Sequence, residues 1–79
     1  MEVRELPRGE RASDDTDRAT INVLPSGKAG FTLVWQAGTV TAHVLQGNDF
    51  PDESAAFEAA KRAAEERNIE VLHVERPDA

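Results

Sequence analysis

The stretch Phe50-Pro51-Asp52-Glu53-Ser54 and the run AAFEAAKRAAEER at positions 55–67 decide the fold of this chain. The run contains no glycine, proline or β-branched residue, and alanine loses no side-chain entropy when a helix forms. Asp52 is placed to cap the N–H groups of the first turn, where the negative charge of Glu53 is also favourable. Asn68 suits the left-handed position that follows a helix. We therefore predict one helix that starts after Asp52 and ends near Asn68.

The two faces of this helix differ in the size and charge of their side chains. One face carries positions 56, 57, 60, 63 and 64, which are all alanine except Phe57. The opposite face is charged and is expected to remain in water. A face of small residues allows the helix to approach a sheet closely, with Phe57 as its one bulky side chain. Truncation of a buried Phe57 to alanine is expected to cost about 3–5 kcal/mol.

Four segments around the helix have the alternation or the β-branched composition of strands. They cover residues 20–24, 31–36, 39–45 and 70–75. Only Ala37 and Gly38 separate the second segment from the third, which predicts a hairpin with a two-residue turn. The side chains that this register places beneath the helix are Phe31, Leu33, Trp35, Val40, Ala42 and Val44. Trp35 is thus expected in the core, and the alternative is an anchor in an interface.

The order of elements, β-β-β-α-β, predicts an α+β fold. One helix packs on one face of a small four-stranded mixed sheet and forms a two-layer sandwich. The helix connects the third strand to the fourth, so these strands should run parallel, and the fourth strand is expected beside residues 20–24. Residues 19–79 form this single domain. Residues 1–18 are charged and without periodicity, and they are expected to be a disordered or loosely ordered N-terminal tail.

The composition limits the classes of function. The chain of 79 residues has a formal net charge of −6, which argues against binding to nucleic acid or to an anionic membrane. It has no cysteine, so disulfides and thiolate metal sites are excluded. No apolar run is long enough for a membrane span, and the N-terminus lacks the apolar region of a signal peptide. These features predict a cytoplasmic location.

Few side chains in this sequence are suited to catalysis. The chain has no tyrosine and only two histidines, neither of which lies in a motif with a nucleophile. Ser26-Gly27-Lys28 has part of the composition of a phosphate-binding loop, but it leads into a strand rather than a helix, so this interpretation is rejected. We therefore expect a protein that is not an enzyme and that has no cofactor.

The face of the sheet away from the helix is the predicted association surface. It is largely uncharged, and a domain of this size has little core, so burial against a partner would stabilise it. The predicted interface residues are Thr32, Val34, Thr41, His43, Leu45, Val71 and His73. The expected function is non-catalytic protein–protein interaction or self-association, for example as a homodimer, through this open sheet face or an edge strand.

Two other functions remain open from the sequence. His43 and His73 both lie on the predicted open face, and they suggest a metal- or pH-sensing regulatory protein if the two rings come together or a second copy contributes. The second open function is that of a subunit of a small-ligand enzyme whose site lies between subunits.

Overall fold

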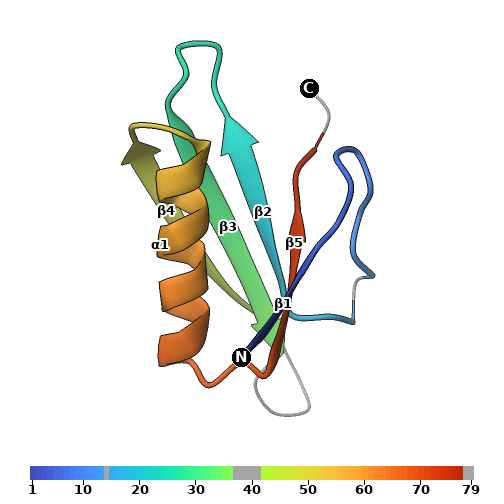
Figure 1. Cartoon of the computed structure of the whole chain (residues 1–79). Coiled ribbons are helices and arrows are strands. Elements are labelled where there is room, and N and C mark those ends of the chain that lie inside the picture. The colour runs from blue at the N-terminus through green and yellow to red at the C-terminus, as the bar shows by residue number, and fades with distance from the viewer. Residues whose placement is uncertain (14, 37–41, 78–79) are drawn as a thin grey trace.

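The computed structural model describes residues 1–13, 15–36 and 42–77, and these contain five strands and one helix (Figure 1). The elements in chain order are β1 (Glu2–Glu5), β2 (Arg18–Val23), β3 (Ala29–Gln36), β4 (Ala42–Phe50), α1 (Glu53–Glu66) and β5 (Val71–Glu75). The strands form one mixed sheet in the order β1-β5-β2-β3-β4. The α+β class is confirmed, and so is the position of the last strand beside the strand that contains residue 20. The described residues contain no helix that is long and apolar enough to cross a membrane.

The sheet has five strands rather than the predicted four, because the expected N-terminal tail contributes β1. This strand pairs in parallel with β5, from Glu2 opposite Val71 to Glu5 opposite Val74. The Leu6 N–H extends the pairing by donating to the Val74 carbonyl at 2.9 Å. An edge strand can be held by backbone hydrogen bonds alone, so its side chains need not show an apolar period. Residues 2–5, which the sequence assigned to a disordered or loosely ordered tail, thus form a strand in this structure.

The ends of α1 follow the sequence signals. Asp52 adopts an extended conformation, and its side chain accepts a hydrogen bond from the Ala55 N–H at 2.8 Å. At the other end Asn68 has a φ angle of 57°, in the left-handed region. The Ile69 N–H donates to the Ala64 carbonyl at 3.2 Å, and the Ile69 side chain is buried. The predicted cap and the predicted stop of the helix are both confirmed.

The core lies between the alanine face of α1 and the sheet. Ala56, Ala60 and Ala64 are fully buried, and the sheet supplies the bulk from side chains that include Ile21, Phe31, Leu33, Leu72 and Val74. Phe57 is only partly buried at the margin, where the guanidinium of Arg76 lies 5.3 Å from its ring centre. The prediction that Phe57 is the buried bulk beneath the helix is therefore wrong, because close approach of the helix leaves room only for side chains from the sheet.

The hairpin formed by β3 and β4 has a register different from the predicted one. Trp35 lies opposite His43 instead of Val40, and Leu33 lies opposite Leu45 instead of Ala42. The shift is by three residues, and because side chains alternate along a strand, it moves each β4 side chain to the other face. Residues 37–41, with the predicted turn and Val40, lie outside the described residues.

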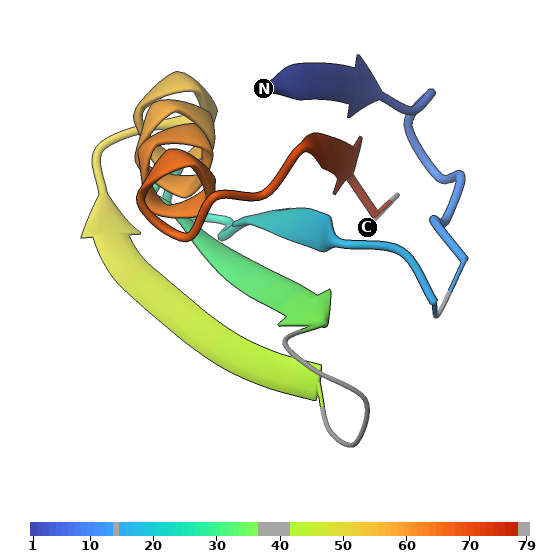
Figure 2. The ribbon, with the colours of Figure 1, turned by 90° about the horizontal axis from the view of Figure 1, so that it is seen from below.

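Two crossover connections run on opposite faces of the sheet. Helix α1 makes the connection from β4 to β5 on one face. On the other face, the connection from β1 to β2 crosses β5; its described residues, 6–13 and 15–17, are called the strap (Figure 2). Glu75 points away from the core and holds the strap by accepting a hydrogen bond from the Ala12 N–H at 2.8 Å; its other oxygen accepts from the Thr20 hydroxyl of β2 at 2.5 Å. The face opposite the helix is therefore only partly open.

Candidate functional site

The predicted interface residues are divided between both faces of the sheet. Thr32 and Val34 lie on the open face of β3, as expected, but both are half-buried. The three-residue shift in register moves His43 and Leu45 to the helix face of β4, so their assignment to the open face is wrong. Thr41 lies outside the described residues.

Val71 and His73 do lie on the face opposite the helix, but in the part of the sheet that the strap crosses. The His73 N–H donates to the Asp17 carbonyl at 3.0 Å, which joins β5 to the end of the strap. The Nδ1 atom of His73 is buried without a hydrogen-bond partner among the described residues. Across the sheet, His73 lies between Arg4 of β1 and Arg18 of β2. This imidazole is therefore half-buried and lies between two charged neighbours beside the strap.

The two histidines do not form a common site within one chain. His43 stacks on Trp35 with 5.4 Å between ring centres, on the side of the sheet that faces the helix. His73 lies on the other face, and β2 and β3 separate the two strands that carry the rings. Trp35 itself is only partly buried, with the Arg67 guanidinium 5.0 Å from its ring. One metal ion cannot reach both imidazoles, and no other metal-binding group of three side chains occurs within residues 1–13, 15–36 and 42–77.

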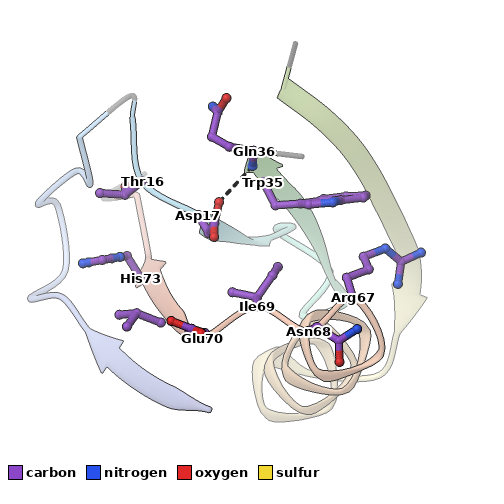
Figure 3. A pocket seen from close by; sticks show the side chains of 10 residues that line it. Thr16, Asp17, Trp35, Gln36, Arg67, Asn68, Ile69, Glu70 and His73 are labelled. Atoms are coloured by element: carbon purple, nitrogen blue, oxygen red, sulfur yellow. Dashed lines mark hydrogen bonds between the residues drawn. The ribbon is translucent and has the colours of Figure 1, made fainter. Parts of the chain in front are cut away.

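A hollow of about 570 Å³ lies at the end of the sheet where β3 ends and β5 begins (Figure 3). Asp17 and Ile69 lie in its middle, with His73 on one side and Arg67 on the other. Two of the charged side chains that line it form hydrogen bonds with backbone groups of the same chain. The Asp17 carboxylate accepts from the Gln36 N–H at 2.9 Å, and Arg67 donates to the Ala63 carbonyl at 2.9 Å. Asp17 and Arg67 therefore join the ends of elements around this hollow.

The two edges of the sheet differ in length and in charge. Edge strand β1 has four residues, of which Glu2, Arg4 and Glu5 are charged. The guanidinium of Arg4 donates to the Glu2 carboxylate and carries the opposite charge, and it thereby lowers the pKa of Glu2. A short strand with charged side chains is a poor template for a further strand. The β1 edge is protected in this way.

Edge strand β4 has neither kind of protection. It is nine residues long, and its sequence AHVLQGNDF contains no proline, no lysine and one acidic residue, Asp49. On the open face the Val44 side chain is 60% exposed, and Gln46 is exposed next to it. Asp49 has a φ angle of 67°, so the regular backbone ends there. The segment from Ala42 to Asn48 is therefore a long uncharged edge with alternate N–H and C=O groups directed outward.

The sequence did not identify Val44 and Gln46 as candidate surface residues, because the assumed turn assigned Val44 to the core. One signal against that turn was present. Ala37-Gly38 is not the Asn-Gly or Asp-Gly pair that favours a two-residue hairpin loop. In the observed register the Trp35 ring stacks on the His43 ring.

With this geometry established, the chain was compared with models of protein families, with curated proteins and with solved structures, and none of the three comparisons gives a match.

Proposed function

We propose that this protein is a non-catalytic interaction module that associates by adding a strand to the free edge of β4. The observation that carries the proposal is the uncharged segment from Ala42 to Asn48 of the nine-residue edge strand β4, in contrast to the short, charged edge of β1 in the same sheet. A strand edge of this kind presents a row of backbone donors and acceptors that another strand satisfies.

The structure favours this edge over the open sheet face as the site of association. The strap crosses the part of that face formed by β5, with Ala12 bound to Glu75. The part formed by β3 presents Thr32 and Val34, which are half-buried. Val44 is a large apolar side chain that is exposed on this side, and it lies on the edge strand itself. An added strand would cover the Val44 side chain and would also form hydrogen bonds with the outward N–H and C=O groups of β4.

The expected affinity is weak. Antiparallel pairing makes about one backbone hydrogen bond per residue, so a nine-residue strand gains roughly 4–13 kcal/mol at about 0.5–1.5 kcal/mol for each bond. Association costs about 4–15 kcal/mol in lost freedom of motion. Because these two quantities nearly cancel, side chains such as Val44 decide whether a complex forms. A single charge at the edge should be enough to prevent it.

The test is a titration of the ¹⁵N-labelled chain with a synthetic peptide of residues 42–50, followed by backbone amide shifts. We expect saturable shifts and slower amide exchange along β4. Val44→Lys should abolish the response, whereas Asn22→Lys, with the same charge change at an exposed position two strands away, should retain it. Uniform small shifts, or equal binding by the two variants, would reject strand addition at β4.

A further inference from the structure

The geometry points to a second copy of this chain as the strand that adds to β4, with the two β4 strands antiparallel about a two-fold axis at Gln46. This inference rests on the proposed function and names the partner. The pairing of the two β4 strands joins two five-stranded sheets into one continuous sheet. The two-fold axis stands perpendicular to that sheet, so both helices lie on the same face.

Charge selects the edge and the direction of pairing. Two copies that each carry a net charge of −6 repel, so contact between them requires a surface without acidic groups. The segment from Ala42 to Asn48 meets this requirement. In a parallel pair the two Asp49 carboxylates would lie side by side. In the antiparallel pair they are about 20 Å apart, at about 3.4 Å per residue, which is beyond the Debye length of about 8 Å in physiological salt.

The position of the axis follows from the length of β4. Gln46 is the midpoint of Ala42–Phe50, and an axis there pairs the residues from Val44 to Asn48, all within the regular part of the strand that ends at Asp49. Leu45 then lies opposite Gly47 of the second copy. Gly47 has no side chain, and the Phe31 ring of its own chain covers it closely, since a Cβ built there would lie 2.4 Å from the ring. The half-buried Leu45 thus meets the Phe31 ring of the second copy, which fills the space over Gly47 and offers an apolar contact.

On the other face the axis brings the two Gln46 side chains together, and Val44 lies opposite Asn48 of the second copy. These side chains are exposed in one chain, so pairing covers them without disturbing the core. The contact is confined to one strand and its neighbours and is smaller than the roughly 1,200–2,000 Å² of a stable interface. We therefore infer a dimer that dissociates in the micromolar to millimolar range.

Cysteine crosslinking tests the axis directly, because the chain has no cysteine of its own. Residues opposite one another in an antiparallel pair have Cα atoms about 4.5–5.5 Å apart, which a disulfide can span. Gln46→Cys should form a disulfide-linked dimer under mild oxidation at least tenfold faster than Asn22→Cys, an exposed position of similar accessibility. Sedimentation equilibrium of the cysteine-free chain should show a monomer–dimer equilibrium, which Val44→Lys shifts to monomer.

The outcomes separate the two proposals. A strict monomer at millimolar concentration, or equal crosslinking of the two cysteine variants, overturns the second copy as the partner. If the peptide of residues 42–50 still binds β4 in that case, strand addition stands and the occupant is another protein. If neither the chain nor the peptide binds, both proposals fail. The melting temperature of each variant establishes that it is folded.

Discussion

Removal of the Glu75 carboxylate should release the strap while the helix and the central strands stay in place. Glu75 is 9% exposed, and it is the one charged residue among the buried side chains of the described residues. Its two oxygens accept one hydrogen bond each, from the Ala12 N–H and from the Thr20 hydroxyl. The carboxylate therefore joins Ala12 of the strap to β5 and joins β5 to β2, and within residues 1–13, 15–36 and 42–77 no other side chain accepts from the Ala12 N–H.

The expected size of the effect comes from these two bonds. Hydrogen bonds to a charged group contribute about 1.5–3 kcal/mol each, but solvent can replace part of the bond to the Thr20 hydroxyl when the strap opens. Glu75→Ala should lower the free energy of unfolding by about 2–4 kcal/mol. Glu75→Gln has a side chain of the same shape and retains one acceptor oxygen, so it should lower the free energy of unfolding by only about 1 kcal/mol. Thr20→Val removes the second bond alone and should also cost about 1 kcal/mol.

Urea denaturation of the native chain and the three variants measures these differences in the free energy of unfolding. Amide hydrogen exchange then shows which strands lose protection. In Glu75→Ala the amides of Ala12 and of β1 should exchange faster than those of β3 by more than the global loss of stability explains. The reasoning is wrong if Glu75→Ala changes stability by less than about 0.5 kcal/mol. It is also wrong if protection falls equally in every strand, since the carboxylate would then stabilise the sheet as a whole.

Three further predictions follow from the core, the helix cap and the β1 edge. Leu33→Ala should lower the free energy of unfolding by about 2–5 kcal/mol, because Leu33 is fully buried. Phe57→Ala should lower it by only about 1–2 kcal/mol, because Phe57 is partly exposed. If urea denaturation gives the larger loss for Phe57→Ala, the observed core is contradicted. Asp52→Ala should cost about 1 kcal/mol through loss of the helix cap and Asp52→Asn much less, and equal losses of thermal stability would show that capping is not the cause. Because folding lowers the pKa of Glu2, its ion pair with Arg4 stabilises the fold above the ordinary value of 4.5 and is lost as the pH falls through the folded value. Hydrogen exchange of the β1 amides, corrected for the intrinsic rate, should thus become faster in the native chain when the pH falls below the pKa of Glu2 in the folded state. The Glu2→Gln variant should not show this increase.

The helix and the fold class could be predicted because their determinants are local. The Asp52 cap, the alanine run and the Asn68 stop act within a few residues of one another, and the structure agrees with all three. The inward side of β3 could also be predicted from its alternation, with Phe31 and Leu33 buried as expected. For these elements the free energy of the local conformation and the burial of apolar side chains favour the same structure.

The candidate site could not be predicted, because it depends on how strands pair across the sheet. The strand β4 has apolar or small side chains on both faces, so its pattern permits two registers, and the packing of Leu45 and the stacking of His43 on Trp35 fix the one observed. The strand β1 carries no apolar pattern, and it is ordered by contacts from distant parts of the chain: the backbone of β5, the core that Val3 contacts and the ion pair of Glu5 with Arg76. The sequence by itself determined the helix, its caps and the apolar side of the central strands. The tertiary structure decided which strands became edges, because pairing between distant backbone segments depends on the shape of the whole sheet.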